Sequence, residues 1–153
     1  MEKFVEDSGI EMIGRLKIEV FGGDGMLKMV QEVPNLVVTA GKDVIADRMK
    51  GTPAKGAMTH MSLGTSSTTP AAADTTLGVE IAGSRVGLSS TSVSGNAVTY
   101  SASFGAGVGT GAVVEAGIFN AASAGDMLCR TTFSVVNKGA NDTMTVTWTV
   151  TIS

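Results

Sequence analysis

The sequence "TMTVTWTVTIS", residues 143–153, decides the fold class. Met144, Val146, Trp148, Val150 and Ile152 alternate with threonines at every odd position from 143 to 151. A strict period of two predicts a β-strand with one buried apolar face, and threonine is β-branched, which favours the pleated backbone. An unprotected edge strand this regular would invite aggregation. We therefore expect this strand to be central in its sheet, or paired with another subunit.

Upstream segments repeat the pattern. Residues 15–21 and 26–33 flank the turn-forming "GGDG", and we expect Pro34 to end the second strand because proline has no N–H to donate. Later strands are predicted at 58–63, 84–93, 97–104, 112–119 and 127–136, with a long loop at 64–76. Ser94, Gly95 and Asn96 form the expected hairpin turn between the second and third of these segments.

A helix is expected only near residues 40–50, where Val44, Ile45, Arg48 and Met49 have helical spacing. Thr39 is the expected N-cap and Gly51 the expected C-cap. Together the pattern predicts an all-β, antiparallel β-sandwich or jelly roll with this one short helix. Residues 1–12 are expected to form an extended N-terminal arm, and residues 13–153 a single domain.

Composition narrows the class of function. Charged residues make up 16% of the chain, the net charge is −3, and no Lys/Arg cluster is present, so nucleic acid is not an expected partner. Mean hydropathy is +0.27, but no apolar run reaches the roughly 18 residues of a membrane-spanning helix. The acidic, interrupted start of the chain does not resemble a secretory signal. A surface low in charge suits protein contacts.

Candidate catalytic and metal-binding residues are few. His60 is the single histidine, no GxSxG motif accompanies it, and Cys129 is expected to be a small core residue. Glu115 interrupts an apolar run, and we expect it either on a solvated strand face or paired with Arg85 or Arg130. We therefore predict no enzyme, no cofactor and no metal site.

The methionines leave two interpretations open. Met26, Met29, Met49, Met58 and Met61 are expected to fill a core that has few aromatic residues, although flexible methionines also suit an adaptable binding surface.

Four segments resemble a pattern found in bacteriophage virion proteins. They are "NLVVTAGKDVIADRM" (35–49), "MSLGTSSTTPAAADTTLGVEI" (61–81), "VVEAGIF" (113–119) and "LCRTTFSVVNKGANDTMTVTWTVTI" (128–152). The pattern is similar to head decoration (cement) proteins, and also to tail-fibre and tail-collar modules. The resemblance implies a structural, non-enzymatic β-sandwich, commonly trimeric, on the virion surface.

The expected function follows from this resemblance. The chain is expected to be made in the host cytoplasm, to bind the major capsid protein as a homotrimer, and to stabilise the shell. The arm is expected to hold a neighbouring subunit through Phe4, Val5, Ile10 and Met12. A tail-fibre, baseplate or collar adaptor is the alternative, and a carbohydrate-binding sandwich is a third, less expected one.

Overall fold

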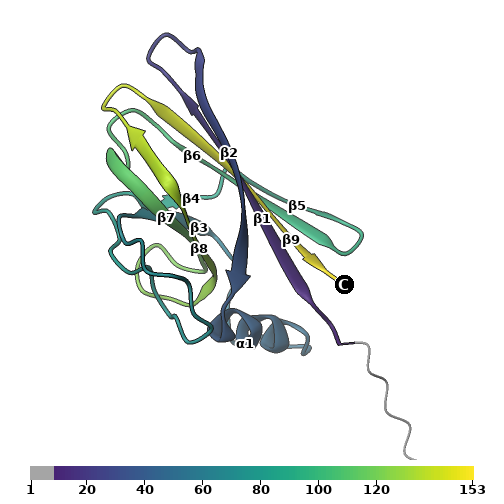
Figure 1. The fold of residues 1–153 in the computed structure, drawn as a ribbon. Helices are drawn as coiled ribbons and strands as arrows, with labels where there is room; N and C mark the ends of the chain where they lie inside the picture. The colour runs from purple at the N-terminus through teal and green to yellow at the C-terminus, as the bar shows by residue number, and fades with distance from the viewer. Residues whose placement is uncertain (1–8) are drawn as a thin grey trace, which may run out of the picture.

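The computed structural model describes residues 9–153, which form nine strands and one helix (Figure 1). The elements in chain order are β1 (Met12–Phe21), β2 (Leu27–Val37), α1 (Thr39–Arg48), β3 (His60–Gly64), β4 (Val86–Gly87), β5 (Ser90–Ser94), β6 (Ala97–Phe104), β7 (Gly111–Phe119), β8 (Met127–Lys138) and β9 (Thr143–Ile152). The predicted all-β class with one short helix is confirmed.

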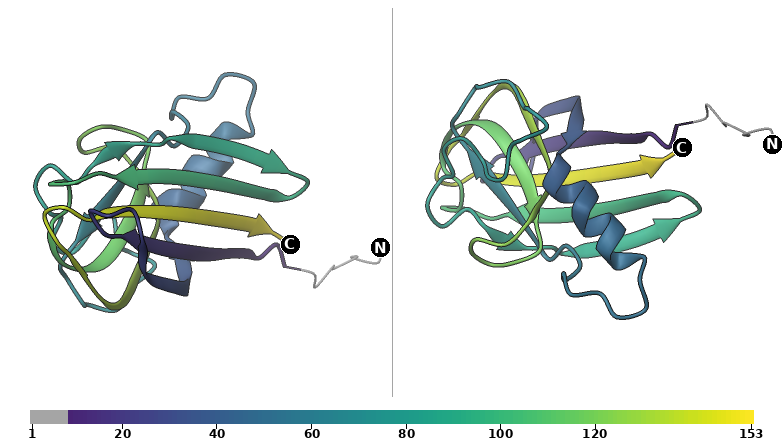
Figure 2. Two further views of the ribbon diagram at one scale, coloured as in Figure 1. Left: turned by 90° about the horizontal axis from the view of Figure 1, so that it is seen from above. Right: turned by 90° about the horizontal axis from the view of Figure 1, so that it is seen from below.

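The nine strands form one antiparallel sheet in the order β4-β3-β7-β8-β2-β1-β9-β6-β5. β2 joins its two halves, because most of β2 pairs with β1 while its last residues, Leu36 and Val37, pair with Arg130 and Cys129 of β8. The sheet therefore curls into an open half-barrel whose two halves face each other across the core (Figures 1 and 2). Two separate sheets, as in the expected sandwich or jelly roll, are not confirmed.

β9 is central, as its alternation predicts, with β1 on one side and β6 on the other. Met144, Val146 and Trp148 are fully buried, whereas the intervening threonines are partly exposed on the outer face. On that outer face Thr149 Oγ1 lies 3.1 Å from Thr99 Oγ1 of β6. The threonine face thus supplies β propensity and cross-strand hydroxyl contacts while the opposite face fills the core.

Pro34 does not end β2, which corrects the sequence-based expectation. It pairs with Arg15 inside the β1–β2 ladder, and its carbonyl oxygen accepts a 2.7 Å hydrogen bond from Thr131 Oγ1 of β8. The nitrogen and carbonyl of a strand residue point to the same edge, so the proline nitrogen also faces β8 and not β1. The missing N–H therefore removes no bond from the β1 ladder.

Helix α1 is present, but both expected caps are wrong. Thr39 is the first helical residue and Val38 is the N-cap, without a side-chain hydrogen bond, while Met49 is the C-cap. Val38 N–H is bonded to the Leu128 carbonyl, so β2 runs almost directly into the helix. A Cβ on Gly41 would lie 2.1 Å from the Leu128 oxygen, so glycine is what lets the helix approach β8.

The middle of the chain follows the prediction in part. The expected strand at 84–93 is divided into β4 and β5. The expected hairpin turn is present, but it contains only Gly95 and Asn96, because Ser94 belongs to β5 and pairs with Ala97. The loop after Gly64 contains no helix or longer strand before β4, only an isolated bridge to Glu80. In the part of the chain that the structure describes, no helix is long and apolar enough to cross a membrane.

Candidate functional site

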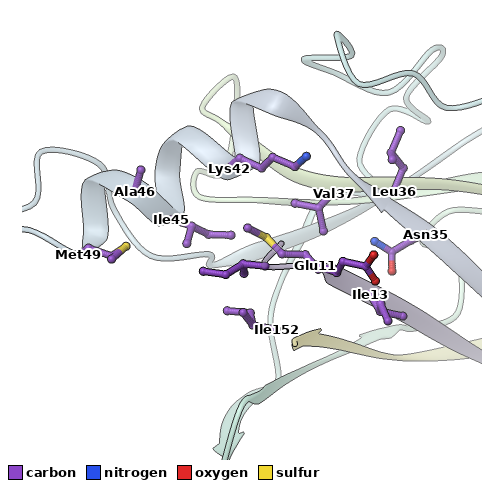
Figure 3. Close-up of a pocket in the computed structure, with 12 residues that line it drawn as sticks. Glu11, Ile13, Asn35, Leu36, Val37, Lys42, Ile45, Ala46, Met49 and Ile152 are labelled. Carbon is purple, nitrogen blue, oxygen red and sulfur yellow. The ribbon is translucent and has the colours of Figure 1, made fainter. Parts of the chain in front are cut away.

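An open apolar hollow of about 760 Å³ lies between α1 and the ends of β1 and β9 (Figure 3). One wall comprises residues 10–13 leading into and along β1, together with Ile152 of β9, and the opposite wall is Ile45, Ala46 and Met49 of α1. Residues 35–37 of β2 close its inner end, and Lys42 lies at its rim. We call this hollow the β1–α1 groove.

The groove exists because β1 and β2 separate. Their pairing stops at Gly14 and Asn35, after which Leu36 and Val37 turn away to pair with β8. Between residues 9 and 13, therefore, no strand of the described chain lies along the edge of β1 that faces β2. The result is a wedge bounded by one strand and one helix (Figures 1 and 3).

The main-chain groups of β1 show which residues face this wedge. Glu11 N–H donates to the Ser153 carbonyl at 2.9 Å, and Ser153 N–H donates back at 2.8 Å, so the peptide groups of Glu11 face β9. Successive residues of a strand direct these groups to opposite edges. Ile10 and Met12 therefore present an N–H and a C=O each to the wedge.

A polar side chain closes the inner end of the groove. Asn35 Oδ1 accepts a 2.7 Å hydrogen bond from Trp148 Nε1, and because indole nitrogen only donates, this bond fixes the amide orientation. The other amide atom, Nδ2, is buried and has no hydrogen-bond partner among residues 9–153. A buried donor of this kind is costly unless it is satisfied.

The groove also leaves apolar side chains in contact with solvent. Ile10 is 76% exposed and Met49 is 84% exposed, while Met12 and Ile45 are half-buried against the core. Ile10 and Met12, two of the four predicted partner-binding residues, are thus brought together here. The other two, Phe4 and Val5, lie outside the described residues.

The charges at the groove are sparse. Lys42 lines the rim and forms no ion pair with any described residue, and Glu11 is exposed on the opposite wall. This favours an occupant that is mainly apolar and carries one or two acidic groups beside its apolar side chains.

Glu115 is the second polar feature of note, and it is fully buried on β7. Of the two interpretations, pairing with Arg130 is confirmed, with Nε to Oε1 at 3.4 Å, and the solvated face is wrong. The carboxylate also accepts backbone N–H bonds from Ser66 at 2.7 Å, Gly78 at 2.7 Å and Val79 at 3.1 Å.

Arg130 completes this arrangement by bonding Asp74 at 3.0 Å and the Thr68 carbonyl at 2.9 Å. Every one of these partners lies in the loop between β3 and β4, so Glu115 and Arg130 hold that loop on the sheet. Buried charges paired this completely fit a structural role, which here is to hold the loop against the sheet.

Arg85, the other predicted partner for Glu115, pairs instead with Glu80 through two 2.9 Å bonds and stacks 3.7 Å over the Phe119 ring. Ser62 Oγ also donates to Glu80. Burial alone would raise the pKa of Glu80, but the Arg85 and Ser62 hydrogen bonds outweigh it and lower that pKa.

His60 and Cys129 are the remaining candidate site residues. His60 begins β3, where its Nδ1 lies 2.8 Å from Thr59 Oγ1. Cys129 is fully buried, as expected of a core residue, and burial raises the pKa of its thiol well above the usual value. Within residues 9–153, no group of three or more His, Cys, Asp or Glu side chains is placed to hold a metal ion.

The five methionines divide between the two interpretations. Met61 is fully buried, and Met29 and Met58 pack against the core, so core filling is confirmed for these three. Met26 and Met49 are 69% and 84% exposed, which contradicts core filling for both. Met49 borders the β1–α1 groove, whereas Met26 lies in the β1–β2 turn.

The sequence indicated the Glu115–Arg130 pair as one of its alternatives. It did not indicate the groove. Ile10 and Met12 were singled out for their side chains in an acidic segment, whereas Asn35, Ile45 and Met49 gave no separate signal of a site. Comparison with known proteins adds no further guide, because no family model, no curated protein and no solved structure matches this chain.

Proposed function

We propose that this chain is a bacteriophage capsid decoration protein, an oligomeric subunit that binds the outer capsid surface and stabilises the shell. The observation that carries the oligomeric part of the proposal is the β1–α1 groove. It is an apolar wedge with an open strand edge, which suits a polypeptide segment better than a small polar substrate.

The outer face of the sheet supports an adhesive role. β9 and β6 present threonine and serine there, and the charged residues nearest them are on β1. A hydroxyl-bearing surface forms hydrogen bonds without the desolvation of many full charges. We propose that this face, repeated in each copy of a homotrimer, rests on the major capsid protein at the virion surface.

Binding of the protein to the assembled shell stabilises the shell through thermodynamic linkage. A protein that binds only the assembled shell shifts the equilibrium toward that shell by mass action. Several weak contacts within one oligomer give an avidity that exceeds each contact by about 10²–10⁴-fold when they engage together. No catalytic step is part of this function.

The test uses capsids assembled without this protein. Purified protein is added, the capsids are sedimented, and the bound copies are counted while shell melting is followed by light scattering. The proposal expects saturable binding at a simple ratio to the capsid protein and a higher melting temperature. A shell that neither binds the protein nor gains stability would contradict it, and binding to isolated tails would establish the tail adaptor.

The carbohydrate-binding alternative loses its main support. Trp148 is fully buried and hydrogen-bonded, and Tyr100 is packed against the core, where burial raises its pKa to about 12. The Trp148 ring is not free to stack on a sugar, and the Tyr100 ring is partly covered.

A further inference from the structure

We infer that the β1–α1 groove receives the N-terminal segment of a second copy of this chain, added as a short strand to the open edge of β1. The inference names the partner of the groove and so rests on its proposed role as a polypeptide-binding site. It does not depend on attachment to a capsid.

The main-chain groups at the open edge of β1 match the backbone of an extended peptide. Ile10 and Met12 direct N–H and C=O groups into the wedge, and strand addition satisfies such groups with the backbone of an extended segment. Asn35 lies at the inner end of the wedge, where its Nδ2 is buried without a partner among the described residues. The wedge is therefore matched to an extended peptide.

The side chains and charge of the N-terminal segment match those of the groove. The wall formed by Ile45 and Met49 requires apolar side chains, and the rim carries Lys42, which forms no ion pair within residues 9–153. The eight residues before Gly9 read "MEKFVEDS", with Phe4 and Val5 between acidic residues. An extended segment of this composition supplies apolar groups for the wall and a carboxylate for Lys42.

The N-terminal segment is long enough to fill the wedge. A strand rises about 3.3 Å per residue, so eight residues extend about 26 Å, roughly twice the span of residues 10–13. About four residues of this segment are therefore enough to span the wedge, and the residues between them and Gly9 can connect two copies.

The chain's own N-terminal segment is too close to the open edge of β1 to fill the wedge, so the segment comes from a second copy. Gly9 immediately precedes Ile10, where the open edge begins, so the chain's own segment would have to reverse within two or three residues. A two-residue turn at Ser8 and Gly9 would set Glu6 directly opposite Glu11, and like charges facing each other across a strand pair are destabilising. A segment from a second copy is free of this register and can place Lys3 near Glu11.

Insertion of one copy's N-terminal segment into the groove of another copy also determines the symmetry of the oligomer. Donor segment and receiving groove are different surfaces, so each contact is heterologous, and repeated contacts of this type close into a ring when the rotation permits. A closed ring of three copies agrees with the trimer expected for this protein.

The main test is site-specific cross-linking of the full chain. Two differently tagged variants, Val5→Cys and Met49→Cys, are co-expressed and oxidised, and covalent products are separated without reductant. Cys129 is fully buried and does not compete. A covalent dimer carrying both tags is expected in the mixture, and none with either variant alone. A Val5→Cys/Met49→Cys double variant that closes only within one chain would overturn the inference, as would a mixture that gives no dimer.

A second test compares two exposed methionines. Met49→Glu places a charge in the groove, while Met26→Glu makes the same change in the β1–β2 turn. Sedimentation equilibrium should show the oligomer dissociation constant of Met49→Glu raised at least about tenfold, which corresponds to 1.4 kcal/mol, with Met26→Glu unchanged. Equal behaviour of the two variants would overturn the inference. Because both tests use purified protein, they are independent of whether the protein binds capsids.

Discussion

Trp148 on β9 and Asn35 on β2 are joined by a 2.7 Å hydrogen bond that spans 113 positions of sequence. β1 lies between these two strands in the sheet, and Gly14 of β1 leaves the space through which the bond passes. The core and the groove therefore meet at Asn35, whose amide oxygen is held by the core and which lines the inner end of the wedge.

The first prediction concerns Gly14. A Cβ at this position would lie 1.5 Å from Asn35 Oδ1, so Gly14→Ala must displace the amide and break its bond to Trp148. Overpacking together with a lost buried hydrogen bond should lower the free energy of unfolding by about 2–4 kcal/mol, measured by urea denaturation. Gly51→Ala is the matched control, since no atom lies within 4 Å of its added Cβ. Equal stability of the two variants would show that Asn35 is not held as described.

The second prediction concerns Glu115. In Glu115→Gln the carboxylate that accepts three backbone N–H bonds and pairs with Arg130 is lost, leaving Arg130 partly uncompensated. Breaking a buried pair typically costs about 3–5 kcal/mol. Hydrogen exchange should also show faster exchange at the amides of Ser66, Gly78 and Val79. Glu32→Gln removes only an exposed contact to Arg15 and should change stability by less than about 1 kcal/mol.

The third prediction concerns pH. The folded-state pKa of Glu80 is lowered from 4.5, so unfolding raises the proton affinity of this group. Its contribution to stability is therefore fully present above about pH 5.5, and it is lost as pH falls through 4.5 and then through the folded-state pKa. Unfolding free energies of the wild type and Glu80→Gln should differ by a constant amount near pH 7 and converge as the pH falls below the folded-state pKa of Glu80. A gap that widens on acidification would refute the assigned role of Arg85 and Ser62.

The fourth prediction concerns Cys129. Because it is buried and burial raises the pKa of its thiol, it should not react with a thiol reagent at pH 8 in the folded protein. In denaturant one thiol per chain should titrate at once. Rapid reaction without denaturant would show that β8 opens readily beside the core.

Sequence patterns predicted those parts of the fold that depend on neighbouring residues. The alternation of β9 gave its central place, and the Gly95–Asn96 turn gave the β5–β6 hairpin. Pro34 was misjudged because the effect of proline depends on which edge its nitrogen faces, and only the neighbouring Thr131 reveals that edge. Thr39 was misjudged because β2 enters α1 without an intervening cap residue of the usual type.

The groove could be predicted only in part, for a related reason. Ile10 and Met12 were recognisable as unassigned apolar residues near the start of the chain. The wedge itself arises where β2 leaves β1 for β8, and that divergence involves Arg130 and Cys129, nearly a hundred positions away. No local pattern carries that information.

The copy number of this chain in purified virions, measured by quantitative mass spectrometry against the major capsid protein, tests the central claim most directly. A capsid decoration protein predicts a ratio near one to one or a simple fraction of it. A ratio below roughly one in twenty would contradict decoration of the shell and place the protein in the tail.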